Sequence, residues 1–501
     1  MEWQEVGGRM WKSLRLRTKI EAIAAIFFIV LLVTASVASV SRTITDSSDS
    51  VETYIRNSNG KYWPATGANL QTAINDLTSG GTVYVPVGTI DLSSDLTINN
   101  KVWLKGSGIG NTVLRQADGS TTHSGVIRCH SKNNFTISDL TIDGNLAGVA
   151  EGYNCIDIKD CSKFIVRDIS IINPTRNGIC IYSSSFKGII SNIFCEHSPG
   201  TAPTAGYHAL DIGYSRQIAI NNIVIQNFVG TTQAIDFAGI RDSTISNINV
   251  NNSAMAMKVT GNSASPTENC TFTNLVFKEI TGGEGIKIEY TKRCSFNNIQ
   301  VSLHTTSGES QAFMVYTSSG ITKFINLNNI YIDHSNGTGL TVTADNVSIN
   351  NIFIYNTTKN QGLYLSGDDI TISNLHIRNA YSSGVKITGT LRVTIIGGII
   401  DDNYYPGGYG YGIDMEGTKY TVLEGLHIFN NNGDGIETGG GTANSNYTIT
   451  NCYFYGNAKA IDTGATDNYY IIIGNTCYGD AIDDNNAAAT KVIANNIATI
   501  T

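Results

Sequence analysis

The sequence predicts an all-β fold, a parallel β-helix in which short strands coil into a solenoid. A phrase of the form apolar-x-Asn-apolar-x-apolar recurs between residues 136 and 499, as in ISNIFC at 190–195 and INNIFI at 349–354. Its central Asn or Asp returns every 22 to 31 residues between Asp139 and Asn374. A repeat of this length is typical of solenoid proteins.

A second phrase alternates with the first and consists of a small residue followed by apolar-x-apolar. Examples are GICI at 178–181, AIDF at 234–237 and GVKI at 384–387. Both phrases have a period of two, which indicates strands rather than helices. Their apolar positions are mostly Ile, Val and Phe, which favour strands, and they lack the leucine framework of leucine-rich repeats.

The recurrent Asn has an expected structural role at a corner between two strands. Asn tolerates positive φ, which a tight corner requires, and stacked coils would place each amide where it can donate to the next. The predicted corner residues are Asp139, Asp168, Asn192, Asn222, Asn247, Asn274, Asn298, Asn329, Asn351, Asn374 and Asn451.

The N-terminal region predicts the compartment. A basic segment at 1–19 precedes the apolar segment 20–40, and 41–60 reads as a polar linker to a β-helix over 61–501. The apolar segment fits either a signal peptide or a membrane anchor. Either interpretation places the β-helix outside the cytoplasm, secreted or anchored to the cell membrane.

Charge and cysteine content exclude two classes of site. The net charge is −8, without a basic stripe, so a nucleic-acid partner is not expected. Nine cysteines occur without a spacing typical of zinc sites. Cys270/Cys294 and Cys452/Cys477 are expected at equivalent positions of adjacent coils. There the Cβ separation exceeds the disulfide ideal, which favours free, inward thiols.

The stretch from Lys61 to Arg115 resembles a known family cap. It contains GANLQTAINDLTSGGTVYVPVG at 67–88 and TINNKVWLKGSG at 97–108. These motifs resemble the N-terminal cap of the pectate-lyase superfamily, which includes polygalacturonases, rhamnogalacturonase-like epimerase domains and phage tailspikes. The resemblance implies a right-handed β-helix, a capping helix at its N-terminal end, and binding or processing of a polysaccharide in a groove along one sheet. The helix would bury the face formed by Leu70, Ala73, Ile74 and Leu77.

The catalytic motifs of the superfamily are not present. The chain lacks the Asn-Thr-Asp and Gly-His-Gly of polygalacturonases and the Asp-Pro-His-Asp of alginate epimerases. The resemblance therefore predicts the fold more strongly than an activity.

The middle position of the second phrase predicts a column of side chains on one sheet, which we expect to be exposed. In chain order it reads Asp157, Cys180, Asp211, Asp236, Lys258, Lys287, Met314, Thr341, Tyr364, Lys386, Asp414, Glu437, Asp462 and Asp483. Carboxylates on adjacent and alternate coils would lie about 5 and 10 Å apart, which brackets the separations found in glycosidases.

Two groups in this column are candidate sites. Asp211 and Asp236, with His208 and Lys258, are candidate catalytic residues. Asp157 and Lys287 are candidate substrate contacts beside them. The alternative is a solvated face with incidental charges.

The second group lies near the C-terminal end of the column. Asp414, Glu437 and Asp462 are candidate calcium ligands, and the first two are also candidate substrate contacts. The loop at 401–412 adds a candidate stacking platform for sugar rings. The alternative interpretation of this segment is a Tyr-rich loop that covers the edge of a coil and binds no sugar. The platform residues are Tyr404, Tyr405, Tyr409 and Tyr411.

The sequence alone leaves two functions of different classes open. One is an extracellular carbohydrate-active protein: a lyase, hydrolase or epimerase, with calcium as its candidate cofactor. The other is a non-catalytic rod for adhesion or envelope structure. The apolar residues Val492, Ile493, Ile497 and Ile500 of the last coil further predict either pairing with another subunit or fraying of that coil.

Overall fold

The computed structural model describes nine stretches of the chain, to which all structural statements refer. The N-terminal segment 1–52, with the expected leader or anchor and most of the linker, lies outside them. The helices that the structure describes include none long and apolar enough to cross a membrane. The described residues are 53–120, 125–149, 152–198, 207–305, 310–317, 320–408, 410–439, 441–486 and 490–499.

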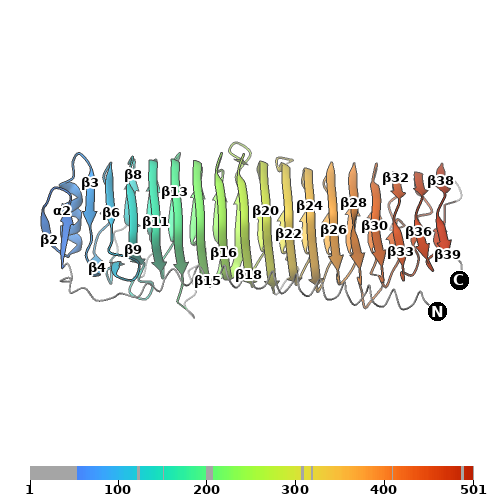
Figure 1. Cartoon of the computed structure of the whole chain (residues 1–501), viewed down its shortest axis with the longest axis horizontal. Helices are drawn as coiled ribbons and strands as arrows, with labels where there is room; N and C mark the ends of the chain where they lie inside the picture. Colours follow the sequence, from blue (N-terminus) through green and yellow to red (C-terminus); the bar gives the residue numbers. More distant parts are fainter. Residues whose placement is uncertain are drawn as a thin grey trace, which may run out of the picture. The chain divides into compact units, whose positions relative to one another are not determined.

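The described residues between 53 and 499 form one compact unit, a parallel β-solenoid of about 15 turns (Figure 1). The described residues contain 39 strands, and apart from β1 and β2, which pair antiparallel, each strand pairs in parallel with strands one coil away. The only helix in this part of the chain is α2, Gly67–Asn75. The predicted all-β parallel solenoid is therefore confirmed.

One face is a sheet of short strands, which we call the short-strand sheet. It is completed by the C-terminal ends of two longer strands, β15 and β16. Its strands are β5 (Leu96–Thr97), β8 (Gly125–His130), β10 (Asn154–Lys159), β12 (Ile179–Tyr182), β14 (Leu210–Gly213), β19 (Ile286–Ile288), β21 (Phe313–Val315), β23 (Leu340–Val342), β25 (Leu363–Leu365), β27 (Val385–Thr388), β29 (Ile413–Glu416), β31 (Ile436–Glu437), β34 (Ile461–Thr463) and β37 (Ile482–Asp484).

The first phrase forms long strands that bend at their central residue. They are β9 (Thr136–Asp143), β11 (Ser162–Ile172), β13 (Phe186–Glu196), β15 (Arg216–Ala238), β16 (Thr244–Thr260), β18 (Thr271–Ile280), β20 (Thr291–His304), β22 (Lys323–Ser335), β24 (Asp345–Thr357), β26 (Ile370–Arg378), β28 (Val393–Asp401) and β30 (Val422–Phe429). In the last coils the bend separates two strands, giving β32 (Ser445–Thr450) and β33 (Tyr453–Tyr455), β35 (Asn468–Ile473) and β36 (Thr476–Tyr478), and β38 (Lys491–Ala494) and β39 (Ile497–Thr499).

The first coils contain shorter elements. These are β1 (Tyr54–Asn57), β2 (Tyr62–Pro64), β3 (Gly81–Tyr84), β4 (Gly88–Leu92), β6 (Val102–Lys105) and β7 (Thr112–Gln116), with β17 (Thr267–Glu268) further along the chain. The predicted helix face is correct, because Leu70, Ala73, Ile74 and Leu77 are all buried. Helix α2 begins after Thr66, whose side chain accepts a hydrogen bond from the Asn69 amide, and it lies beside β2 and β3 in Figure 1.

The bend of each long strand is made by the predicted corner residue. All eleven predicted residues have positive φ, from 54° at Asn329 to 60° at Asp139. Three coils carry glycine at the bend instead: Gly397 and Gly425, each with φ of 64°, and Gly474, with φ of 70°. The corner therefore requires the left-handed conformation, which Asn, Asp and Gly adopt at low cost.

The corner amides form a continuous ladder over much of the solenoid. Each Nδ2 donates to the side-chain oxygen of the preceding coil at 2.7–3.0 Å. The donor and acceptor pairs are Asn192 to Asp168, Asn222 to Asn192, Asn274 to Asn247, Asn298 to Asn274, Asn329 to Asn298, Asn351 to Asn329 and Asn374 to Asn351. The ladder is irregular at one coil, where Asn247 donates to Asn221 instead of to the corner residue Asn222.

The interior is a single column of apolar side chains stacked from coil to coil. Phe272 and Phe296 on adjacent coils stack with ring centroids 4.5 Å apart and planes within 3°. All nine cysteines are free and buried, which confirms the prediction for Cys270, Cys294, Cys452 and Cys477. Cys270 and Cys294 occupy equivalent positions, because the next residues of β18 and β20, Thr271 and Ser295, are register partners.

The contribution of a corner residue to stability can be tested at Asn298, which donates to Asn274 and accepts from Asn329. Asn298→Gly loses both bonds but keeps an easy positive φ, so we expect a loss of about 1 kcal/mol in unfolding free energy. Asn298→Ala adds backbone strain, for a loss of about 2–3 kcal/mol.

Chemical denaturation and hydrogen exchange at the flanking strands measure this difference. Asn326→Ala, an exposed outward position of β22, is the control and should be nearly neutral. Equal stability of the Gly and Ala variants would contradict the role assigned to the left-handed corner.

Candidate functional site

The short-strand sheet aligns the predicted column in its predicted order. Asp157 pairs with Cys180, Cys180 with Asp211, Asp211 with Asp236, and Asp236 with Lys258. The register continues without a slip through Lys287, Met314, Thr341, Tyr364, Lys386, Asp414, Glu437, Asp462 and Asp483.

The expectation that this column is exposed is wrong. Asp157, Cys180 and Thr341 are 1%, 8% and 6% exposed, and the other members are half-buried. Side chains on neighbouring strands of a parallel sheet shield one another, so a residue in the middle of a column retains little free surface. The column is therefore a partly desolvated strip of polar groups.

At the N-terminal end of the column, Asp157 is a buried partner of a histidine. His130 Nε2 lies 2.7 Å from Asp157 Oδ2, and Asn154 Nδ2 donates to Oδ1 at 3.1 Å. Arg128 Nε donates to His130 Nδ1 at 3.0 Å, which leaves the proton of neutral His130 on Nε2, facing the carboxylate. Asp157 therefore orients His130 and, being buried, is not itself a surface for substrate.

Arg128 and His130 were not among the predicted site residues. Arg128 is the register partner of Asp157 and so occupies the same column one coil earlier. The segment IRC at 127–129 has the apolar-x-apolar pattern, with Val126 in place of the small residue, so the sequence contained a weaker form of this signal. Tyr182 also lies here, with its ring centroid 6.5 Å from that of His130. Burial, with the charge of Asp157, raises the pKa of Tyr182 to about 12.

The structure brings the candidate catalytic residues together. Asn177 Nδ2 donates to Asp211 Oδ2 at 2.9 Å, and Cys180 Sγ lies 3.6 Å from the same oxygen. Burial raises the pKa of Asp211; His208 opposes this effect and the nearby charge of Asp236 adds to it. Asp236 Oδ1 is buried and has no hydrogen-bond partner among the described residues.

Histidine and lysine flank the two carboxylates. His208 lies in the segment before β14 and its Nδ1 is 2.8 Å from the Gln233 carbonyl oxygen. A carbonyl only accepts, so Nδ1 carries the proton and Nε2 of neutral His208 is an acceptor. Lys258 is the next register partner after Asp236, followed by Lys287, which lies 3.6 Å from Glu289 and over the ring of Tyr316. The group therefore combines two close carboxylates with basic side chains on the following strands.

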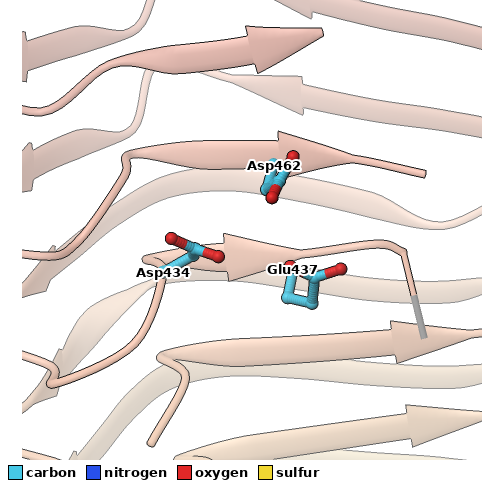
Figure 2. A group of neighbouring side chains, drawn as sticks. All are labelled: Asp434, Glu437 and Asp462. Atoms are coloured by element: carbon cyan, nitrogen blue, oxygen red, sulfur yellow. The ribbon is translucent and has the colours of Figure 1, made fainter. Parts of the chain in front are cut away.

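The second acidic group differs from the predicted one. Asp434, Glu437 and Asp462 have side-chain oxygens within 4.8 Å of one another, and Figure 2 shows them on two neighbouring strands and the turn before one of them. Asp414 is not part of this group, because Lys386 Nζ binds its Oδ2 at 2.7 Å. The predicted set of Asp414, Glu437 and Asp462 is therefore corrected by exchanging Asp414 for Asp434.

Burial and mutual repulsion control the charge of this acidic group. The pKa of Glu437 is raised to about 7, mainly by burial and also by the charges of Asp462 and Asp434. Burial also raises the pKa of Asp434. Asp462 is partly neutralised by Lys459, whose Nζ lies 2.5 Å from it and 2.8 Å from Asp483. A proton on Glu437 is thus held near neutral pH in the absence of a cation.

The tyrosines of the 401–412 loop are only partly gathered. Tyr404 is 54% exposed and Tyr405 38% exposed, and the Tyr405 ring meets the Tyr381 ring edge-on at 5.6 Å. Tyr411 is half-buried, and Tyr409 lies outside the described residues. Asp236 and Asp414 are seven register steps apart, roughly 34 Å at about 4.8 Å per strand. The two candidate groups are therefore separate sites on one sheet.

Three loops precede copies of the second phrase, at 146–153, 197–207 and 305–311, and the sequence predicts that they rise beside the short-strand sheet and wall a groove. This remains a prediction. Most of the loop between His197 and Tyr207 lies outside the described residues, as do parts of the loops at 146–153 and 305–311. His197 itself is fully buried and packs edge-on against Phe228.

Two family models match the chain. One, described as a right handed beta helix region, matches residues 311–477. The other, described as rhamnogalacturonase A/epimerase, pectate lyase-like, matches residues 65–274. The two matches do not overlap, and they lie on the N-terminal and C-terminal parts of the same solenoid.

Short stretches of the chain resemble two curated proteins of Azotobacter vinelandii. Mannuronan C5-epimerase AlgE3 is 41% identical over 91 residues, which is 16% of this chain and 5% of the epimerase. Alginate lyase 7 is 42% identical over 77 residues, 13% of this chain and 9% of the lyase. The matched stretches thus span less than a tenth of either relative.

Solved structures with similar folds include an enzyme module and a phage protein. The A-module of the A. vinelandii mannuronan C-5 epimerase AlgE6 aligns over 87% of this chain and 95% of its own, with 17% identity and a TM-score of 0.32. The pre-mature bacteriophage phi29 gene product 12 aligns over 86% of this chain and 53% of its own, with 16% identity and a TM-score of 0.38.

Proposed function

Because the chain belongs to the pectate-lyase-like superfamily of right-handed β-helix proteins, we propose that it binds a polysaccharide along its short-strand sheet and modifies it there. The observation that carries this proposal is the unbroken register that places Asp211 and Asp236 on adjacent strands, with His208 and Lys258 beside them. Partly desolvated carboxylates in such a pair are suited to general acid and base roles.

The environments of the two carboxylates support different roles for Asp211 and Asp236. The raised pKa of Asp211 favours its protonated form, which suits a general acid. Asp236 has an oxygen without a partner, which suits the base or nucleophile. Adjacent strands place the two about 5 Å apart, the separation of retaining glycosidases. The same pair of acid and base would also serve abstraction and return of a sugar proton.

Basic residues on the following strands favour an acidic polymer as substrate. Lys258 and Lys287 extend the column directly from Asp236 and are placed to hold a uronate carboxylate. The names of the matched relatives, mannuronan epimerase and alginate lyase, make polyuronates the first substrates to test.

A second function, a non-catalytic rod that adheres to a glycan, is favoured by one observation. The sequence motifs Gly-His-Gly, Asn-Thr-Asp and Asp-Pro-His-Asp, which supply catalysis in relatives of this fold, do not occur in the chain. For such a rod we expect binding to the short-strand sheet without turnover.

The proposal includes an extracellular location and two further contacts. Segment 20–40 would act as a signal peptide or membrane anchor, and α2 would close the N-terminal end of the core. At the other end β38 and β39 each pair with one strand among the described residues, and Val492 and Ile497 are 49% and 66% exposed. Exposed strand edges of this kind favour self-association.

Calcium is the proposed ligand of the acidic group Asp434, Glu437 and Asp462. Their oxygens lie within 4.8 Å of one another, close enough to share an ion with Ca–O distances of about 2.3–2.6 Å. Lys459 competes for Asp462, so binding would require that contact to loosen. Calcium would hold the neighbouring strands together and supply positive charge to an acidic polymer.

The first prediction concerns activity on polyuronates. Asp211→Asn and Asp236→Asn should each lower kcat by about 10²-fold or more, because each removes one partner of the acid and base pair. Asp483→Asn, in the same column near its C-terminal end, is the matched control and should retain activity. Absorbance of unsaturated uronates, reducing ends and proton NMR distinguish lyase, hydrolase and epimerase products. Activity unchanged in both Asn variants would contradict the assignment, and binding without turnover would favour the rod.

The second prediction concerns calcium and pH. Bound calcium requires ionised Glu437, whose pKa is about 7, so affinity should rise as pH increases through 7 and level off above 8. In the absence of calcium the sign is opposite: the folded pKa exceeds the unfolded value of 4.5, so Glu437 costs stability as pH rises from 4.5 through 7. Because Glu437 is half-buried, screening limits this cost to about 1–2 kcal/mol.

Calorimetric titration with CaCl₂ at pH 6 and pH 8 measures the affinity, and denaturation in chelator measures the stability. Glu437→Gln should abolish both dependences on pH, while Glu424→Gln, on the exterior of β30, should change neither. Calcium affinity that is independent of pH, or unchanged in Glu437→Gln, would exclude this group as the site.

A further inference from the structure

A stripe of aromatic side chains covers a different face of the solenoid. It lies on the strand segments that follow the corner in β22, β24, β26, β28 and β30, and on β33 and β36, which stand side by side in Figure 1. Its most exposed rings are Tyr331, Phe353, Tyr453, Tyr455 and Tyr478, at 38–51% exposure. The outward side chains form two rows across these strands, one through Tyr331, Phe353 and Tyr453 and the other through Tyr355, Tyr455 and Tyr478. We call these two rows the aromatic stripe.

The rows are fixed by register and contain neighbouring rings in contact. Tyr331 pairs with Phe353, which pairs with His376, and two residues further along Tyr355 pairs with Arg378. Ring centroids lie 5.8 Å apart for Tyr331 and Tyr355, and 5.1 Å apart for Tyr355 and His376. The stripe is therefore an ordered surface.

The exposed aromatics are concentrated in the C-terminal part of this face. On the four coils before Tyr331 the same register position is held by Gln300, Val276, Asn249 and Val224, and the half-buried Phe194 one coil earlier is a single further ring. If these rings only stabilised the stacking of coils, the earlier coils would need them equally. Rings, histidines included, lie on six of these seven neighbouring strands, with Ile399 and Asp401 at the positions of β28, and this concentration points to a ligand.

A polar centre lies within the stripe. Tyr355 Oη and His376 Nδ1 are 3.0 Å apart, and Arg378 Nε and Nη2 donate to Asp401 Oδ2 at 2.8 and 2.5 Å. Asp401 is 0% exposed. Its Oδ1 and His376 Nε2 face each other at 3.7 Å without a hydrogen-bond partner among the described residues. Within the described part of the chain, the centre therefore places two buried polar atoms without hydrogen-bond partners beside the rings.

The dimensions suit an extended ligand. Six register steps give a length of about 29 Å, and the two rows lie about 7 Å apart. The resulting area of roughly 200 Å² is well below the ~800 Å² per partner of a stable protein interface. A linear polymer fits this strip, whereas a second folded chain would need a wider surface.

The charges of the stripe favour a neutral polymer. Its two rows carry the carboxylates of Asp333 and Asp401 against the single guanidinium of Arg378, a net charge of −1. The guanidinium is already bound by Asp401. A polyuronate would therefore be repelled. Sugar rings present an apolar face to aromatic side chains and hydroxyl groups to polar ones, which matches both components of the stripe.

We propose that the aromatic stripe is a second binding surface, for a linear neutral polysaccharide. It goes beyond the proposed function because it lies on another face and uses none of the residues of the Asp211 and Asp236 pair. A chain such as this would hold one glycan on the stripe while the short-strand sheet engages another.

The test uses the full chain with neutral hexasaccharides of glucose, mannose and xylose, and with hexauronates, by calorimetry. We expect a neutral hexasaccharide to bind, and the double variant Tyr331→Ala, Tyr453→Ala to weaken it about tenfold or more. Tyr62→Ala, 63% exposed on β2, is the matched control and should leave affinity unchanged. Asp211→Asn should also leave it unchanged, which separates this surface from the proposed activity.

Three results would overturn the proposal. They are no binding of any neutral hexasaccharide, binding that the double tyrosine variant does not weaken, and binding of hexauronates alone. Circular dichroism of the variant checks that its fold is intact. Sedimentation provides a further contradiction: a dimer that dissociates in the double variant would assign the stripe to a second copy of this chain.

Discussion

The structure depends on one backbone constraint, the left-handed residue at the corner of each long strand. A residue with positive φ turns the chain sharply enough for apolar side chains on both sides of the corner to face the same interior. Asn meets this requirement and adds an amide that donates to the preceding coil, as Asn298 does to Asn274. Gly397 and Gly425 show that the conformation is needed even where the amide is absent.

Because the corner recurs once per coil, it also sets the register of every other face. A shift by one residue would turn each outward side chain into the core. The polar column of the short-strand sheet and the aromatic stripe are both consequences of this fixed register. They occupy different faces, so each surface can have its own charge and ligand without altering the other.

Much of this was readable in the sequence because it depends on local pattern. Period-two alternation predicts the strands, the conformational preference of Asn predicts the corner, and phase alignment predicts the order of the column. Burial was not readable, since it depends on neighbours in adjacent coils: Asp157 is enclosed by His130 and Asn154. Asp434 was missed because it lies outside the repeated phrase, and only the turn before β31 brings it to Glu437.

The aromatic stripe was present in the sequence but was interpreted only as strand. Tyr331 and Phe353 occupy the variable position of the first phrase, in IYI and IFI, where alternation already explains the apolar neighbours. Recognising a surface there requires comparing that position across successive coils. The comparison that identified the short-strand column works equally well for this second face.

The register of the short-strand column is the central claim, and a series of spin-label distances tests it most directly. Cysteine pairs that join position 258 to positions 364, 386, 414 and 437 lie four, five, six and seven register steps apart. The native cysteines are buried, which favours labelling at the introduced sites. The account predicts distances that increase linearly by about 4.8 Å per step, from roughly 19 to 34 Å. A series that departs from this line by a whole step would contradict the alignment of the coils and, with it, the assembly of both surfaces.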